Sequence, residues 1–484
     1  MIPRFGASFV DEADGRAVLP WTTERAGRLR VAVDQGCGGQ RSASVLEPTV
    51  MVDARRKGEL GEDARATAPE AIEPGRTLPA RSLDFWFDYT CPFAYLGSTQ
   101  APALAARMGV PLTYRPLLLG GVFKALGTPQ NLFASRGPAR TAHEANDMAR
   151  WAKRFGVELT MPAAHPMRSV EALRATLATD IDPRVVAGFY RAYWVLGRPI
   201  SSPEVIADVV AAAGHDPAKV LALIETDAIK DDLRLRTDEA IALGIFGVPA
   251  WIVDGSHLYW GQDRITFVEG VRPREAPARA APAEQRTLEV FWDFSSPFGY
   301  LAAMQVDAIA QRAGAKVVWH PILLGGLFRS IGTPEVPLAT FSEAKQRYIL
   351  ADLHRWAAWC RVPFRFPSRF PTHSLKALRL YLALPEDRRA HYREATFRAC
   401  WADDRDITDE HVLAECVGDE AIAREALARA GSDEVKAALR ASTESAAARG
   451  VFGVPTFIVD DELFWGQDRL ELVLDALLAA DTRS

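Results

Sequence analysis

Two patterns of apolar residues alternate along the chain. Short, dense runs such as "LDFWF" at 83–87 and "LEVFW" at 288–292 are typical of buried β-strands. Apolar residues three and four positions apart, as in "ANDMARWAKRFG" at 145–156 and "YILADLHRWAAWC" at 348–360, predict amphipathic helices. The chain therefore mixes strands and helices, and it belongs to the α/β class.

The order of these predicted elements indicates a particular fold. A strand ("SLDFWFDY") ends at a Cys-Pro step, a helix follows, and "LTYRPLL" predicts a second strand. A long helical middle comes next, then a strand after Val-Pro ("AWIVDG"), a short strand and a last helix. The order β-α-β, helical insertion, β-β-α predicts a thioredoxin fold interrupted by helices.

The whole pattern occurs twice. "YRPLLLGGVFKALGTP" matches "WHPILLGGLFRSIGTP", and "GIFGVPAWIVDGSHLYWGQDRI" matches "GVFGVPTFIVDDELFWGQDRL". So long a period means two complete domains in tandem, not a solenoid. We expect an N-terminal extension (1–80) that is disordered or loosely structured, a first domain (82–270), a semi-stiff linker rich in Pro, Ala and charge (271–286), and a second domain (287–480).

Composition and charge narrow the range of partners. The net charge of the 484 residues is −5, which gives no electrostatic reason to expect nucleic acid or anionic membrane as a partner. No apolar run has the length of a transmembrane helix. The five cysteines form no C-x-x-C pair, and the histidines show no metal-ligand spacing. We therefore expect a cytoplasmic protein without a disulfide framework or a metal site.

The residue at the end of the first strand is the main chemical candidate in each copy. It is Cys91 in the first copy and Ser296 in the second, and each is followed by a proline that suits the first helical position. A helix N-terminus should lower the pKa of a cysteine and make it a nucleophile. A serine there can donate to an anion, or it can be an ordinary N-cap. Ala94 stands where a second redox cysteine would be, which counts against a dithiol mechanism.

Four ordered motifs, each present twice, carry a resemblance to a known family. They are D-x-x-[S/C]-P-[F/Y], R/H-P-x-L-L-G-G-x-F, F-G-V-P and G-Q-D-R. Both copies resemble the 2-hydroxychromene-2-carboxylate isomerase and kappa-class glutathione transferase family, which is related to the DsbA-type disulfide oxidases. The resemblance implies a cis proline in F-G-V-P that faces the nucleophile loop, and glutathione as the cofactor.

The same resemblance implies which residues bind glutathione. The backbone before the cis proline would pair with its cysteinyl part, the G-Q-D-R motif would bind its γ-glutamyl end, and a cation early in the insertion would hold its glycyl carboxylate. These residues are Val248, Pro249, Gln262, Asp263 and Arg140 in the first copy, and Val454, Pro455, Gln467, Asp468 and Lys345 in the second. Arg264 and Arg469 are interpreted as structural partners.

The sequence thus leads to three functional hypotheses. The first is a glutathione-dependent isomerase or transferase for an electrophilic, aromatic-derived small molecule, with Ser296 stabilising the glutathione thiolate. The second is a monothiol thiol–disulfide oxidoreductase that uses Cys91. The third is a non-catalytic binding protein with degenerate sites. By analogy with a dimer of single-copy relatives, the two domains are expected to pack on each other.

Overall fold

A computed structural model of the chain describes residues 82–130, 136–270 and 285–479. The predictions for the extension 1–80 and for nearly all of the linker concern residues outside these ranges. Among the described residues, no helix combines the length and the apolar character that a membrane crossing requires.

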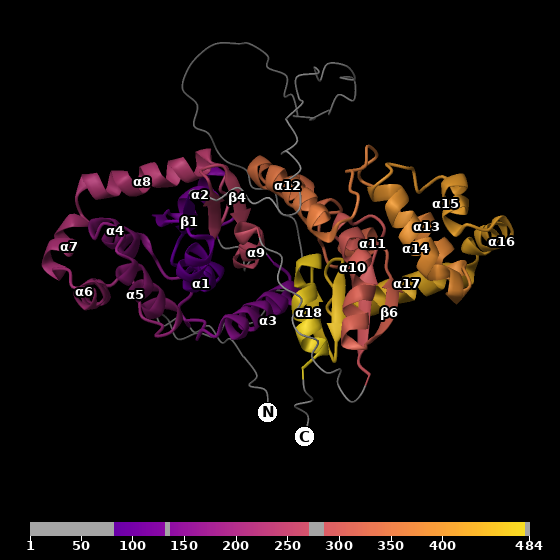
Figure 1. The fold of residues 1–484 in the computed structure, drawn as a ribbon, viewed down its shortest axis with the longest axis horizontal. Helices are drawn as coiled ribbons and strands as arrows, with labels where there is room; N and C mark the ends of the chain where they lie inside the picture. The colour runs from indigo at the N-terminus through magenta and orange to yellow at the C-terminus, as the bar shows by residue number, and fades with distance from the viewer. Residues whose placement is uncertain (1–81, 131–135, 271–284, 480–484) are drawn as a thin grey trace, which may run out of the picture. The chain divides into compact units, whose positions relative to one another are not determined.

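The first domain is built on a four-stranded sheet in the order β2-β1-β3-β4 (Figure 1). The central strand β1 runs parallel to β2 and antiparallel to β3, so Leu83 lies opposite both Leu112 and Val253. Four of its five residues are buried and apolar, and the fifth, Asp84, is partly exposed. The strands are β1 (Leu83–Phe87), β2 (Leu112–Pro116), β3 (Ala250–Val253) and β4 (His257–Trp260).

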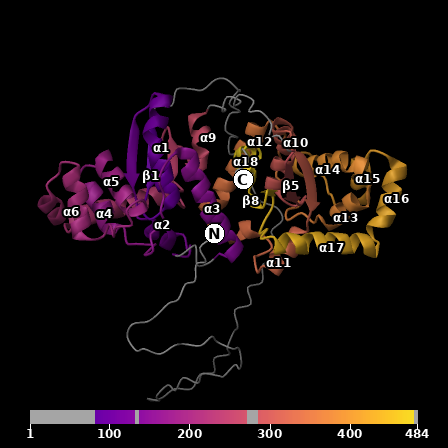
Figure 2. The same cartoon turned by 90° about the horizontal axis from the view of Figure 1, so that it is seen from below.

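Helices enclose this sheet and form the insertion. Helix α1 starts at Pro92 and ends at Gly109, whose φ of 67° is the left-handed conformation that glycine adopts without strain. Helices α4 to α8 gather on the side of the domain away from α3 (Figures 1 and 2). The helices are α1 (Pro92–Met108), α2 (Leu119–Ala125), α3 (Pro138–Phe155), α4 (Val170–Ala178), α5 (Pro183–Trp194), α6 (Pro203–Ala212), α7 (Pro217–Leu223), α8 (Asp227–Ala242), the 3₁₀ turn η2 (Gln262–Arg264) and α9 (Ile265–Glu269).

The second domain repeats this arrangement with the sheet order β6-β5-β7-β8. Its strands are β5 (Thr287–Trp292), β6 (Lys316–Pro321), β7 (Thr456–Val459) and β8 (Glu462–Trp465). Its helices are α10 (Pro297–Ala313), α11 (Leu324–Ser330), η3 (Pro337–Thr340), α12 (Glu343–Cys360), α13 (Leu375–Ala383), α14 (Glu386–Trp401), α15 (Glu410–Val417), α16 (Glu420–Ala430), α17 (Asp433–Ala448), η4 (Gln467–Arg469) and α18 (Leu470–Leu477). The predicted fold class, two thioredoxin-like domains with helical insertions, is confirmed.

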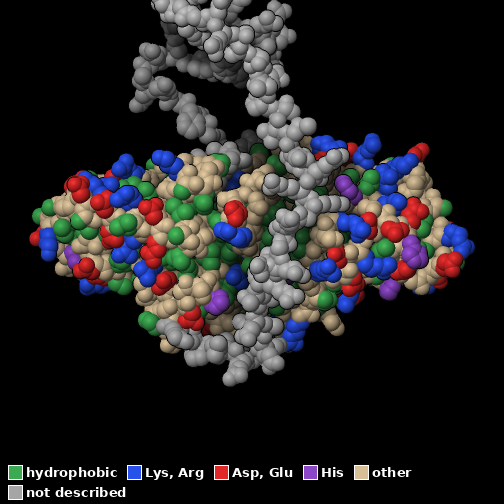
Figure 3. All heavy atoms as spheres, turned by 90° about the horizontal axis from the view of Figure 1, so that it is seen from above, with side chains coloured by type: hydrophobic (Ala, Val, Ile, Leu, Met, Phe, Trp, Pro, Cys, Tyr) green, Lys and Arg blue, Asp and Glu red, His purple; other side chains and the backbone are tan. Residues whose placement is uncertain are grey.

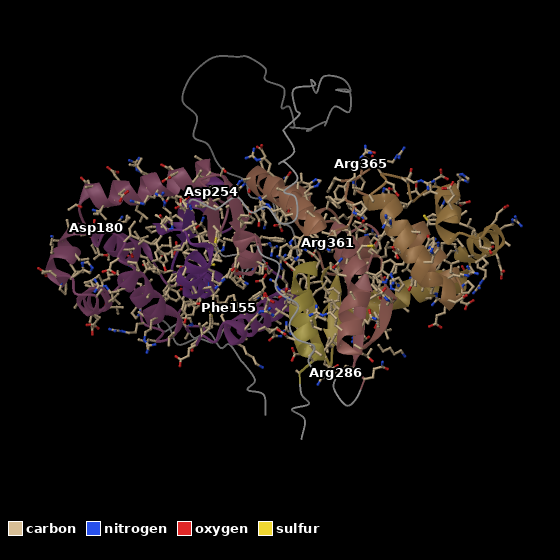
Figure 4. The ribbon with its side chains drawn as sticks, in the orientation of Figure 1. Phe155, Asp180, Asp254, Arg286, Arg361 and Arg365 are labelled. Carbon is tan, nitrogen blue, oxygen red and sulfur yellow. The ribbon has the colours of Figure 1, made fainter. Side chains whose placement is uncertain are left out.

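Helices α3 and α12 are the elements that join the two domains. The buried stripe of α3 includes Trp151 and Ala152, which belong to the same apolar cluster as Val290 and Phe457 of the second domain. From α12, Trp356 makes an edge contact with the ring of Phe267 in α9, with ring centroids 4.8 Å apart. Figure 4 labels Phe155 and Arg361, which mark the C-terminal ends of α3 and α12.

Candidate active site

Cys91 and Ser296 occupy equivalent places at the N-termini of α1 and α10. The Cys91 thiol donates to the carbonyl oxygen of Val248 at 3.0 Å, and the Ser296 hydroxyl donates to that of Val454 at 3.2 Å. Ser296 Oγ also accepts the backbone N–H of Gly299 at 3.1 Å, so it is the N-cap of α10 as well. In both domains the peptide bond after that valine is cis, as the resemblance implied. The fold thus brings the nucleophile position and F-G-V-P together twice.

The expected lowering of the Cys91 pKa is wrong. Burial raises the pKa of this thiol to about 12, against the opposite effects of the backbone N–H groups of Ala94 and Phe93 and of the charge of Arg136. The physical reason is that desolvation of the thiolate outweighs the helix N-terminus here, although the residue is only partly buried by its exposed area. In this state Cys91 is therefore a thiol and not a poised nucleophile.

A buried aspartate holds each nucleophile loop, a role that the sequence reasoning missed. Asp88 accepts the backbone N–H of Thr90 at 3.0 Å and that of Leu119, at the start of α2, at 2.8 Å. Asp293 makes the same two contacts in the second domain, to Ser295 N at 2.9 Å and Leu324 N at 2.7 Å. Burial raises the pKa of both carboxyl groups. The signal was present in the sequence, because this Asp begins the repeated D-x-x-[S/C]-P motif.

The glycine of F-G-V-P makes room for a tryptophan side chain. A Cβ atom on Gly247 would lie 2.9 Å from the indole nitrogen of Trp260, and one on Gly453 would lie 2.7 Å from that of Trp465. Both indole N–H groups are buried and have no hydrogen-bond acceptor within the described residues. Each site thus contains an unused donor beside the cis proline, which is a feature that suits a ligand.

The G-Q-D-R motifs form the 3₁₀ turns η2 and η4 at the end of each sheet. Their glycine has a φ of 111° at Gly261 and 106° at Gly466, and the carboxylate two residues later packs within 2.5 Å of where a Cβ would stand. Only glycine fits such a place. Gln262 and Gln467 are buried behind this turn.

The two motifs meet across the domain boundary in a cluster of charges. Arg264 pairs with its neighbour Asp263 at 3.1 Å and, in the second domain, with Asp352 at 3.1 Å and Asp468 at 3.0 Å. The interpretation of Arg264 as a structural partner agrees with these contacts.

Arg469 makes the mirror-image contacts. It binds Asp147 of α3 at 2.9 Å, Asp263 at 2.7 Å and its neighbour Asp468 at 3.1 Å. Burial acts to raise the pKa of Asp263, but Arg264 and Arg469 overcome this effect and hold it below its usual range. The carboxylates expected to meet the γ-glutamyl amino group are thus already part of an ionic network shared by both domains.

The two predicted cations lie beside the other domain from the one to which the sequence assigned them. Lys345 Nζ stands 5.4 Å from the ring centre of Trp260 and 6.0 Å from that of Phe246, both in the first domain. The guanidinium carbon of Arg140 stands 5.3 Å from the ring centre of Trp465 in the second domain. The sequence reasoning placed each cation in its own copy because it could not see which domain α3 and α12 cover.

A cavity of about 130 Å³ opens in the insertion of the second domain. In the first domain Tyr193 stands just before Trp194, and its hydroxyl accepts the N–H of Met167 at 2.8 Å. Cys400 stands just before the equivalent Trp401 and lacks such a ring. The lining residues are Pro367, Arg369, Pro371, Thr372, His373, Cys400, Asp404, Arg405, Asp406, Ile407 and Thr408.

The described surface offers little sign of a different kind of site. Figure 3 shows basic and acidic side chains interspersed over the face that it draws. Among the described residues, no group of three or more His, Cys, Asp or Glu side chains is placed to hold a metal ion. The paired nucleophile loops are therefore the best candidates for an active site.

Comparison with known families agrees with this geometry. Residues 82–271 and 287–478 both match the DSBA-like thioredoxin domain. The chain belongs to the DsbA-like thioredoxin family. Within this family, 2-hydroxychromene-2-carboxylate isomerase from Sphingobium xenophagum is 32% identical over 204 residues, covering 40% of this chain and 98% of the isomerase.

Two further relatives in the family are similar over one domain. Glutathione S-transferase kappa 1 from Rattus norvegicus is 30% identical over 205 residues, covering 39% of this chain and 89% of the transferase. A solved structure of 2-hydroxychromene-2-carboxylate isomerase is 28% identical and covers 40% of this chain and 94% of its own, with a TM-score of 0.36. The named relatives are enzymes, and each corresponds to one of the two domains present here.

Proposed function

We propose that the chain is a glutathione-dependent isomerase or transferase acting on an electrophilic, aromatic-derived small molecule, with the second domain as the principal reaction site. The observation that carries the proposal is the position of the Ser296 hydroxyl, at the N-terminus of α10 and 3.2 Å from the carbonyl before cis-Pro455. The names of the isomerase and transferase relatives support the substrate class and the cofactor.

The residues present fit glutathione. The backbone of Val454 can pair with its cysteinyl amide, as an added strand would. The unused indole N–H of Trp465 and the buried amide of Gln467 supply polar groups beside it. Bound glutathione supplies the sulfur nucleophile that adds reversibly to the substrate.

Ser296 has a defined part in this reaction. Its hydroxyl hydrogen turns from the Val454 carbonyl toward the sulfur and stabilises the negative charge there, while Oγ keeps the N–H of Gly299. The N-terminus of α10 adds a favourable field for the same charge. Asp293 keeps the loop in place through its bonds to Ser295 and Leu324. The enzyme is thus proposed to hold a thiolate rather than to supply one.

The monothiol oxidoreductase remains a second candidate for the first domain only. In its favour, the Cys91 thiol occupies the same place as Ser296 and contacts the Val248 carbonyl at 3.0 Å. Against it, burial raises the Cys91 pKa to about 12, and the thiolate is the species that attacks a disulfide. We also propose a cytoplasmic location, where reduced glutathione is available to both sites.

Titration of reduced glutathione into the full chain tests the proposal. Calorimetry and the ultraviolet absorbance of the thiolate would be followed for wild type, Ser296→Ala and Cys91→Ala. We expect binding in wild type and a loss of the thiolate signal from the second domain in Ser296→Ala, with turnover of an isomerase-type substrate lowered by about 10²-fold. Absence of glutathione binding in the wild-type chain would refute the proposal and favour a non-catalytic role.

A further inference from the structure

The cavity of about 130 Å³ in the second domain lies beside a position at which the two insertions differ. Cys400, which lines it, stands directly before Trp401, and Tyr193 stands directly before Trp194 in the first domain. The two tryptophans are equivalent, because each donates its indole N–H to a carbonyl oxygen of its nucleophile loop, at 2.8 Å in the first domain and 2.7 Å in the second. The cavity therefore adjoins a cysteine where the first domain has a phenol ring.

In the first domain this phenol ring is held by the loop that precedes α4. The hydroxyl of Tyr193 accepts the backbone N–H of Met167 at 2.8 Å and lies 2.9 Å from Nδ1 of His165. The ring is fully buried, and its centre lies 4.6 Å from that of Trp194. This part of the fold thus encloses a phenol through contacts with both its ring and its oxygen.

In the second domain the same loop lacks a partner for the corresponding N–H group. Thr372 is the counterpart of Met167, 205 positions later, and it lines the cavity. Within the described part of the chain, its backbone N–H has no hydrogen-bond acceptor, and its hydroxyl makes a weak contact of 3.8 Å with the Cys400 thiol. Thr372 therefore offers a donor and an acceptor to a molecule in the cavity.

The size and the apolar part of the lining suit an aromatic ring. Pro367, Pro371 and Ile407 contribute apolar walls, and His373 is exposed at the edge. Cavities of roughly 150 Å³ hold a benzene molecule, so the volume here is close to that required by a single six-membered ring. Apolar walls with a few polar groups are typical of small-molecule sites.

The charged side chains of the lining already have partners, which favours a neutral ligand. Arg369 lies 3.6 Å from Asp406, and Arg405 lies 2.6 Å from Glu415. Asp404 accepts a backbone N–H at 2.7 Å, and Asp406 accepts one at 2.9 Å. A charged ligand would have to compete with these contacts, whereas a neutral ring would leave them in place.

We propose that this cavity binds a small neutral phenol, whose ring lies between the apolar walls and whose oxygen accepts the N–H of Thr372 and donates to its hydroxyl. The ligand would have the part in the second domain that the side chain of Tyr193 has in the first. The inference goes beyond the proposed function and does not rest on it, because none of the residues that line the cavity belongs to the nucleophile loop, to F-G-V-P or to G-Q-D-R.

Calorimetric titration of phenol into the full chain tests the inference, with benzene as the probe that lacks the oxygen. We expect phenol to bind with a dissociation constant on the order of 1 mM, because so small a ligand makes few contacts. Benzene should bind about fivefold more weakly, since it cannot accept the N–H of Thr372. Cys400→Tyr supplies a phenol ring from the chain itself and should abolish saturable binding of phenol. Cys400→Ser is the matched control and should bind phenol as the wild-type chain does.

Tyr193→Cys gives the reverse test in the first domain. This variant carries the same residue as the second domain, so it should bind a second equivalent of phenol. Its thermal unfolding temperature should therefore rise more on addition of phenol than that of the wild-type chain. The measurement decides the question even if Cys400→Tyr does not fold.

Each contrary result would overturn a stated part of the inference. Absence of saturable phenol binding to the wild-type chain would show that the cavity is not a phenol site. Unchanged phenol binding by a folded Cys400→Tyr chain would place the phenol elsewhere, and equal affinities for phenol and benzene would show that the N–H of Thr372 is not used. A Tyr193→Cys chain that gains no more stability from phenol than wild type would contradict the equivalence of the two positions. Because these titrations contain no glutathione, their failure is distinct from failure of the proposed function.

Discussion

The two domains share the same hydrogen bonds around the start of α1 and α10 but differ in the residue at that position, which is Cys91 in one and Ser296 in the other. Asp88 and Asp293 bind their loops in the same way, and the indole nitrogens of Trp194 and Trp401 donate to the equivalent carbonyls of Tyr89 and Phe294 at 2.8 and 2.7 Å. These equivalent hydrogen bonds surround a thiol in one domain and a hydroxyl in the other. They therefore fix the position of the side chain, but they do not determine which reacting group it carries.

The surroundings of the two nucleophile positions differ as well. Arg136, which forms an ion pair with Glu144, contributes a positive charge near Cys91. The residue 205 positions later is Phe341, which packs against Lys345 instead. Arg136 thus bears on the Cys91 site, and Phe341 lies with Lys345 beside Trp260 of the same, first domain.

The largest effect should come from the charge cluster that both domains share. Removing one guanidinium, in Arg264→Met or Arg469→Met, leaves buried carboxylates without compensation and should lower the free energy of unfolding by about 3–5 kcal/mol. Urea denaturation of both variants measures this. The exposed Arg424, which pairs with Glu420, is the control, and Arg424→Met should cost less than about 1 kcal/mol. Clearly unequal losses for Arg264→Met and Arg469→Met would show that the cluster is not symmetric in energy.

The next effect concerns the cavity beside Cys400. Tyr193→Cys removes a fully buried ring and the hydroxyl that bonds Met167, and should destabilise the chain by about 3 kcal/mol. Cys400→Tyr places a ring where space exists and should change stability by less than about 1 kcal/mol. Thermal unfolding of the two variants compares them. A large loss for Cys400→Tyr would mean that the cavity is needed in its present shape.

The smallest effect is a dependence on pH caused by Lys345. Its pKa is about 8 in the folded chain and 10.5 when unperturbed, so the unfolded state binds more protons between these values and stability from this group rises with pH there. Lys345→Met should therefore stabilise the chain at pH 7, and this gain should shrink between pH 8 and 10.5. Urea midpoints of wild type and variant across that range test it. If the stability gain of Lys345→Met stayed constant with pH, the lowered pKa of Lys345 would be contradicted.

Much of the fold could be predicted from the sequence because each strand and each motif occurs in both copies. Each strand and each motif could be checked against its copy. What could not be predicted depends on which surface a helix meets. The stripe of His143, Asp147 and Trp151 in α3 shows that this face is buried, but not that it is buried against the second domain. The prediction of a lowered pKa for Cys91 was wrong for a similar reason, because the desolvation of a sulfur atom depends on how the folded chain packs around it.

The covalent fusion of the two domains changes how such a site can diverge. In a dimer of identical chains, one altered codon changes both sites at once, so a cation useful to one would be imposed on the other. Here Arg136 and Phe341, or Arg140 and Lys345, can be chosen separately in each half. The interdomain pairs restrict this freedom, since Arg264 in one half must keep its match with Asp352 in the other. Substitutions can thus change the two sites independently, whereas the residues that pair between the domains must change together.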